Sequence, residues 1–267
     1  MIPNAEYRAK AIADLRDGFR MGPIWRQIAY NEVRDRYRRS TLGPLWASIT
    51  VGVQASVTAF VLGFLFGNDL NRFMPFITIS LILWNFIMGV VNEGATTFIS
   101  VADRILEIKR PFSYYLYLVV WRNILLLAHS MVVFALAILI FGLYPQWTYI
   151  LAVPGFLLLL ANLSWMALMA AILSVRFRDV PLIVQNAFTL LFWLTPILYD
   201  PAQLHSTVQT IVRLNPLTHL FQVVRAPLLL EVPLLENWVV AIGLAVLGWT
   251  ATFLLFARTR HRIAFWV

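Results

Sequence analysis

The feature that most constrains this chain is the length of its stretches that contain no Asp, Glu, Lys or Arg. The longest of them runs from Asn123 to Val175. A helix needs about 20 apolar residues to cross the hydrocarbon core of a bilayer, so this stretch has room for two crossings. The residues Gly142–Gln146 form the natural turn between them. We therefore expect helices that cross a membrane, because helices satisfy all their backbone hydrogen bonds in lipid.

Other apolar runs complete a set of six predicted spans, at about residues 42–67, 73–100, 116–141, 147–174, 180–199 and 237–257. The composition agrees with this, since 13% of the residues are charged and 60% are hydrophobic, whereas a soluble domain has about 25% charged residues. The sequence predicts an all-α membrane protein with six transmembrane helices. A cytoplasmic amphipathic segment, residues 1–40, precedes a transmembrane domain, residues 41–267.

The N-terminal segment is polar and basic, and its pattern predicts two amphipathic helices. The first covers about Tyr7–Arg20, with Ile12, Leu15 and Phe19 on one face. Gly22-Pro23 separates it from the second helix, which carries Trp25. Basic helices with an apolar face lie in the membrane interface, which is the placement we expect. A soluble tail helix is the alternative.

Residues 101–110 form a short charged island between two predicted spans. Val101, Ile105 and Ile108 recur at helical spacing, and Pro111 ends the pattern, so a short amphipathic helix is expected. Its charged residues are Asp103, Arg104, Glu107, Lys109 and Arg110. One interpretation is a solvated loop, and the other is a helix that a partner protein contacts in order to move the adjacent spans.

Residues 204–230, between the fifth and sixth spans, contain two apolar helical faces interrupted by Asn215-Pro216. Each segment is too short to cross a bilayer, so a re-entrant or interfacial helical hairpin is expected. An ordinary amphipathic loop domain is the alternative.

The distribution of basic residues predicts the topology. Of the 21 Lys and Arg residues, most lie in the N-terminal segment, the charged island, the loop after the fourth span and the C-terminal tail. The opposite face has only Arg72, Arg213 and Arg225. Cytoplasmic loops carry the excess of basic residues, so both termini and the island are expected in the cytoplasm. The net charge of +8 then reflects this bias and not a nucleic-acid partner.

Motifs for enzymatic chemistry are absent from the sequence. There is no cysteine, no glycine-rich phosphate loop followed by Lys and no His-Glu-x-x-His metal motif. Glu93 is the only acid within the predicted spans. Arg122 lies in the third span, and its long side chain is expected to extend to the cytoplasmic interface. We expect a protein that is not an enzyme and that holds no metal or cofactor of its own.

Aromatic residues make up 14% of the chain. Most membrane aromatics pack against neighbours or anchor helices at the interface. A channel for a sugar polymer would also need them, because the C–H face of a pyranose stacks on an aromatic ring. The candidates for such a channel are Phe60, Phe64, Trp84, Phe188, Phe192 and Tyr199.

Several motifs, taken in order, resemble those of a known family. The basic run at residues 36–39 leads into Leu42-Gly43-Pro44-Leu45-Trp46, which opens the first span. Three further motifs follow: Val175–Val180 after the fourth span, Thr195–Tyr199 at the end of the fifth span and Asn215-Pro216 before the last span. Together they are similar to the membrane (permease) subunit of bacterial polysaccharide ABC exporters of the ABC-2 type, which move O-antigen, capsule or teichoic acid.

The resemblance implies a homodimer in the bacterial inner membrane that pairs with two copies of a cytoplasmic ABC ATPase, which binds ATP and Mg. It implies a polysaccharide on undecaprenyl pyrophosphate as substrate, and O-antigen is the expected polymer. It also assigns roles to three segments: an interface helix at residues 7–39, a cytoplasmic coupling helix at 101–110 and periplasmic re-entrant helices at 204–230.

On this hypothesis ATP closes the two ATPases, the coupling helix transmits the movement, and a path opens between the first and fifth spans. Arg38, Arg39 and Arg122 are the candidates for the headgroup entrance. The rival hypotheses are an ABC-2 permease for a drug or lipid, a membrane enzyme that acts on polyprenyl-linked sugars, and a structural membrane anchor.

Overall fold

The computed structural model describes residues 4–36, 38, 45–201 and 204–267, and within these ranges it contains helices and no strand. The helices are α1 Ala5–Arg20, α2 Gly22–Arg36, α3 Leu45–Phe66, α4 Leu70–Ser100, α5 Ala102–Glu107, α6 Phe112–Phe141, α7 Tyr149–Arg176, α8 Val180–Leu194, α9 Ser206–Leu214, α10 Pro216–Leu228 and α11 Leu235–Trp266.

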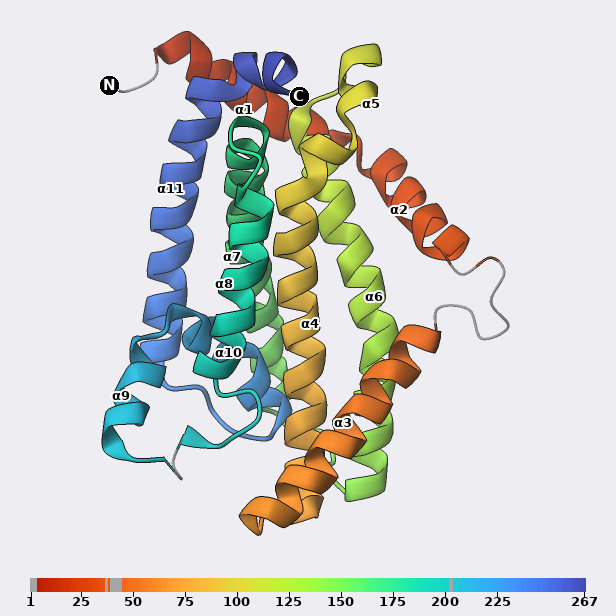
Figure 1. The fold of residues 1–267 in the computed structure, drawn as a ribbon, viewed down its shortest axis with the longest axis vertical. Helices are drawn as coiled ribbons and strands as arrows, with labels where there is room; N and C mark the ends of the chain where they lie inside the picture. The colour runs from red at the N-terminus through yellow and green to blue at the C-terminus, as the bar shows by residue number, and fades with distance from the viewer. Residues whose placement is uncertain (1–3, 37, 39–44, 202–203) are drawn as a thin grey trace.

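The long helix α4 lies at the centre of the bundle (Figure 1). It packs against α3, α6, α7, α8 and α10, and side chains such as Ile77, Ile79 and Ile87 are almost fully buried. The helices α3, α6 and α11 instead present apolar side chains to the outside, including Phe64, Leu139 and Leu247. An apolar outer surface over a packed core is what a bundle surrounded by lipid requires.

Five helices, α3, α4, α6, α7 and α11, are long and apolar enough to cross a membrane. The predicted fifth span, residues 180–199, contains a helix that ends early. α8 stops at Leu194 because Thr195 has an extended backbone, and a residue before proline disfavours the helical conformation. The 15 residues of α8 rise about 22 Å, less than the roughly 30 Å of a bilayer core. The prediction of an all-α membrane protein is confirmed, and the structure supports five of its six spans.

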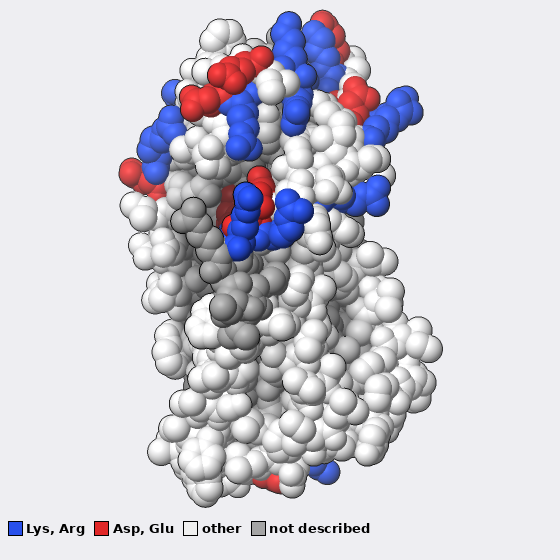
Figure 2. Space-filling model, turned by 90° about the vertical axis from the view of Figure 1, so that its right-hand side faces the viewer, with Lys and Arg blue, Asp and Glu red and all other residues white. Residues whose placement is uncertain are grey.

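Charged side chains gather at one end of the molecule (Figure 2). Figure 1 shows that α1, α5 and the C-terminal end of α11 lie together at this end, which we call the charged end. The turn between α3 and α4, together with α9 and α10, lies at the other end, which we call the opposite end. The two chain termini are therefore on the same side of the bundle.

The two predicted N-terminal helices are confirmed, with the break at Met21. The face of α1 that packs on the bundle consists of Ala11, Asp14 and Gly18, whereas Ile12 and Phe19 are 56% and 67% exposed. Of the predicted apolar face of α1, Ile12 and Phe19 thus point outward, whereas Leu15 packs partly against the core. Such a face, on a basic helix, suits contact with the membrane interface.

Candidate functional site

The helix α5 protrudes from the charged end of the bundle. It follows α4 after the single residue Val101 and has no buried residue. Ile105 packs partly against the core, but Leu106 and Ile108 are exposed. The expectation that Ile108 belongs to the helix is wrong, because the helix ends at Glu107 and Ile108 is extended. The predicted helix over residues 101–110 is therefore only six residues long.

The charges of this segment divide into two groups. Asp103, Arg104, Glu107 and Lys109 are exposed, and in the described part of the chain none of the four has an ion-pair partner. Arg110 instead turns back to α6, where its Nη1 donates to the Tyr114 hydroxyl at 2.9 Å and its guanidinium stacks on the Tyr114 ring. Four of the five predicted coupling residues are thus available to a partner.

The segment after α5 is held by a buried carboxylate that the sequence analysis missed. Asp14 of α1 accepts hydrogen bonds from the backbone N–H groups of Phe112 and Ser113, at 3.2 and 3.0 Å, and from Arg260 of α11, at 2.7 Å. In return, the Ser113 hydroxyl donates to the Asp14 carbonyl at 2.7 Å. A carboxylate at a helix N-terminus satisfies free N–H groups and complements the helix dipole. Asp14 therefore joins α1, α6 and α11 where the coupling segment ends.

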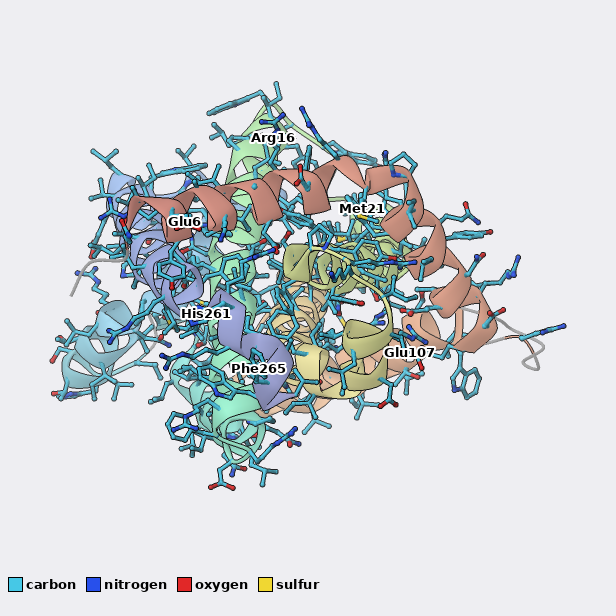
Figure 3. All side chains as sticks on the ribbon, turned by 90° about the horizontal axis from the view of Figure 1, so that it is seen from above. Glu6, Arg16, Met21, Glu107, His261 and Phe265 are labelled. Carbon is cyan, nitrogen blue, oxygen red and sulfur yellow. The ribbon has the colours of Figure 1, made fainter. Side chains whose placement is uncertain are left out.

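A glycine allows this close approach. A Cβ on Gly18 would collide with the Ser113 hydroxyl and would lie 2.9 Å from the Tyr114 backbone nitrogen. Seen from the charged end (Figure 3), α1 crosses the bundle between Glu6 and Met21, and the last turns of α11 lie beside it. The spacing of Ala11, Asp14 and Gly18 along one side of α1 was the available signal for this contact face, which the sequence analysis did not consider.

Arg122 is paired with two acids that the sequence analysis did not connect to it. Its guanidinium lies between Glu32 of α2 and Glu93 of α4, with its Nη2 2.8 Å from Glu93, and its side chain is only 18% exposed. Asn123 also donates to Glu93, at 2.8 Å. Arg36 lies 3.8 Å from the other oxygen of Glu93. Two acids thus neutralise Arg122 and tie the N-terminal helix α2 to the bundle.

A cavity of about 200 Å³ opens beside these ion pairs, between α2, α4, α5 and α6. Arg36, Arg104, Arg110 and Arg122 line it together with Glu32 and Glu93. Of the predicted headgroup residues, Arg122 lines this cavity, Arg38 is exposed and does not line it, and Arg39 lies outside the described residues. The structure therefore adds Arg36, Arg104 and Arg110 to the basic groups that gather here.

The candidate channel aromatics form two separate groups. Phe60 and Phe64 pack edge to face on the exposed side of α3, with ring centroids 4.7 Å apart. Trp84 packs against Phe188 and Phe192 between α4 and α8, at 5.8 and 5.7 Å. In this second group Trp84 and Phe188 are buried, as packing residues are. The Tyr199 hydroxyl donates to the Trp193 carbonyl at 2.9 Å.

These features define a helical membrane protein whose apolar bundle carries a protruding, unpaired charged helix at one end. Comparison with known proteins gives the family. Residues 24–229 match the family described as the ABC-2 type transporter, and the chain belongs to this family of transport subunits.

Two curated relatives are similar over most of the chain. Both are named O-antigen export system permease protein RfbA. The protein from Myxococcus xanthus is 26% identical over 195 residues, which cover 72% of this chain and 75% of the relative. The protein from Klebsiella pneumoniae is 22% identical over 193 residues, which cover 71% and 74%.

Proposed function

We propose that this chain is the permease subunit of an ABC exporter that moves a lipid-linked polysaccharide, most specifically an O-antigen, across the bacterial inner membrane. The observation that carries the proposal is the exposed helix α5, which has three unpaired charges and a fourth at Lys109 just beyond its end, and whose following segment is anchored to the bundle by Asp14. The names of the two relatives support the choice of substrate.

In the proposed topology the charged end faces the cytoplasm, because basic residues accumulate on the cytoplasmic side of membrane proteins. Both termini are then cytoplasmic. The chain crosses the membrane six times, with α8 and the turn at residues 195–199 together making the fifth crossing. The α9–α10 hairpin enters the membrane from the periplasmic side without crossing it, since neither helix is long enough.

A separate cytoplasmic ATPase binds ATP and Mg and contacts α5, and two copies of each subunit form the complex. α4 ends and α6 begins at the two ends of the α5 segment, so a displacement of α5 acts on both helices directly. Through Asp14 it also acts on α1 and α11. Coupling therefore rests on a connection among four helices.

The substrate path runs between α3 and α8, on which the exposed Phe60 and Phe64 and the partly buried Phe192 lie. Their rings offer flat apolar surfaces to sugar units, with no fixed register. The pyrophosphate headgroup enters at the basic groups of the charged end, where Arg38, Arg39 and the cavity beside Arg104 are the candidates. Arg122 supports this entrance by holding α2 in place, since two carboxylates already neutralise it.

Depletion of the protein tests the exporter proposal. Lipid-linked polysaccharide should accumulate on the cytoplasmic face of the inner membrane while the surface polymer disappears, which is measured by glycan labelling of sided vesicles and of whole cells. Unchanged surface polymer, with no lipid-linked intermediate, would contradict the proposal and favour a permease for a drug or another lipid.

Reversal of the charges on α5 tests its role in coupling. The triple variant Asp103→Lys, Arg104→Glu and Glu107→Lys should fold normally, because these side chains are exposed, and should retain ATPase activity in the complex while export falls at least about tenfold. The matched control exchanges Glu6 and Lys10, an exposed ion pair on α1 at the same end. Export that survives the triple reversal would exclude α5 as the coupling helix.

A further inference from the structure

A second cavity lies at the opposite end of the molecule, away from α5. It has a volume of about 610 Å³ and is bounded by the turn into α4, the end of α6, residues 200–201 and the C-terminal part of α10. Small-molecule sites usually occupy about 300–1,000 Å³. The polar residues in its lining are Asn68, Asp69, Arg72, Asp200, Gln222, Arg225 and Glu231.

Arg225 is the most unusual group in this lining, because it is only 2% exposed. Its Nη1 donates to the Ser80 hydroxyl at 3.1 Å and to the Pro196 carbonyl. Its guanidinium carbon lies 4.5 Å from the Phe76 ring and 4.9 Å from the Phe221 ring. In the described part of the chain, these are the only groups that bind it, and no carboxylate lies within 4.0 Å. A buried cation is costly unless something compensates it.

The compensating acids line the same cavity but do not reach Arg225. Asp200 and Glu231 act on it electrostatically from a distance. Burial raises the pKa of the Glu231 carboxyl, and the Arg225 guanidinium opposes that rise. The cavity therefore separates a donor-only group from acceptor-only groups. A ligand that fills it has to accept hydrogen bonds on one side and donate them on the other, and hydroxyl groups do both.

The other features of the cavity favour a neutral ligand with an apolar face. Three acids oppose two arginines in the lining, so a phosphate dianion would meet a net negative surface. Within the described residues no cluster of acids and histidines is close enough to hold a metal ion. Phe73 and Phe76 stack nearly parallel, with ring centroids 5.9 Å apart and an interplanar angle of 14°, and both line the cavity.

We propose that this cavity is a saccharide-binding subsite that takes an uncharged, hydroxyl-rich sugar unit, with its C–H face against the phenylalanines and its hydroxyls between Arg225 and the acids. The inference rests on the proposed function, in which this end faces away from the cytoplasm and receives the leaving polymer. It adds a site at which the polymer is held before release, distinct from the entrance at the charged end.

Direct binding tests this inference. The probe is the host's own surface polysaccharide, freed of lipid by mild acid and reduced to a few repeat units, titrated calorimetrically into the complete permease–ATPase complex in nanodiscs. Gln222→Ala and Glu231→Gln alter partly exposed groups in the lining and leave Arg225 intact. Each should weaken binding at least about tenfold, the loss expected for a hydrogen bond to a ligand at a charged or buried site.

The control variant is Glu236→Gln, in the exposed first turn of α11 at the same end but outside the lining, and it should bind like the unmodified protein. If the oligosaccharide does not bind, or binds equally to all variants, the inference is overturned and the cavity holds only water. Binding of inorganic phosphate that Gln222→Ala and Glu231→Gln weaken would overturn it too, in favour of an anion site.

Two combinations separate this inference from the proposed function. Absence of oligosaccharide binding, together with accumulation of lipid-linked polymer on depletion, rejects the subsite and keeps the exporter. Binding that depends on Gln222, with surface polymer unchanged on depletion, keeps the subsite and rejects the exporter.

Discussion

At the scale of single residues, the charged end depends on ion pairs whose members are distant in the chain. Arg122 lies between Glu32 and Glu93, and Asp14 lies between Arg260 and the first N–H groups of α6. Both sites are largely shielded from water, where removing one partner leaves the other charge uncompensated. Each can therefore be tested by removing one member.

Replacement of Arg122 by Ala should destabilise the protein by about 2–3 kcal/mol. This is less than the roughly 3–5 kcal/mol for a fully buried pair, because the Arg122 side chain is 18% exposed. The apparent melting temperature in detergent should fall, and adding Glu93→Gln should restore part of it. The control Arg36→Ala removes a half-exposed partner of Glu93 at 3.8 Å and should cost at most about 1 kcal/mol. Unchanged export in Arg122→Ala would remove this residue from the entrance.

Asp14→Ala should have a larger effect than any change of an exposed acid on α1. It removes the acceptor of two backbone N–H groups and the partner of Arg260, at a cost of about 2 kcal/mol or more. Asp14→Asn keeps an acceptor oxygen, so its melting temperature should lie between those of the unmodified protein and Asp14→Ala. Asp17→Ala, on the exposed side of the same helix, is the control. Equal stability of Asp14→Ala and Asp17→Ala would show that the junction is unimportant.

At the scale of elements, Asn215 fixes the α9–α10 hairpin to the end of α8. Its Oδ1 accepts from the Leu217 N–H at 3.0 Å and caps α10, where Pro216 occupies the first position. Its Nδ2 donates to the Thr195 hydroxyl at 2.9 Å and to the Leu194 carbonyl at 3.3 Å. One buried side chain thus defines both the start of a helix and its attachment.

Asn215→Ala should therefore loosen the hairpin, at a cost of about 1–2 kcal/mol. Hydrogen exchange measured by mass spectrometry should become faster in α9 and in the first turns of α10, with α4 unaffected. Thr210→Ala, on the exposed side of α9, serves as the reference. Equally slow exchange in both variants would show that packing alone holds the hairpin.

At the scale of the whole molecule, the number of membrane crossings decides how the two ends are used. The absence of cysteine allows single cysteines to be labelled with no background. Cysteines at Glu107 and Phe177 should react with an impermeant maleimide only from the cytoplasmic side, and those at Val208 and Leu235 only from the periplasmic side. All four positions are exposed. Labelling of Phe177 and Val208 from the same side would show that α8 does not cross.

Much of the fold follows from local patterns. The charge-free runs predict the long helices, since lipid demands about 20 apolar residues for each crossing. Gly22-Pro23 marks the N-terminal break to within two residues, and Asn215-Pro216 marks the start of α10. The family resemblance was confirmed by the match over residues 24–229. The length of α8 was overestimated, because the apolar pattern continues through Thr195-Pro196 although the helix does not.

The pairings were decided only by the tertiary structure. The sequence suggested the interface for Arg122 and a helical position for Ile108, and it offered no partner for Asp14 or Arg225. Periodicity indicates which side of a helix is apolar. The ion pairs instead form where helices cross, between residues that are 29 to 246 positions apart in the chain. The sequence by itself thus determined the helices and the family of this protein. The packing of those helices decided which charges are neutralised, which remain free on α5 and where the two cavities lie, because burial depends on neighbours that no local pattern contains.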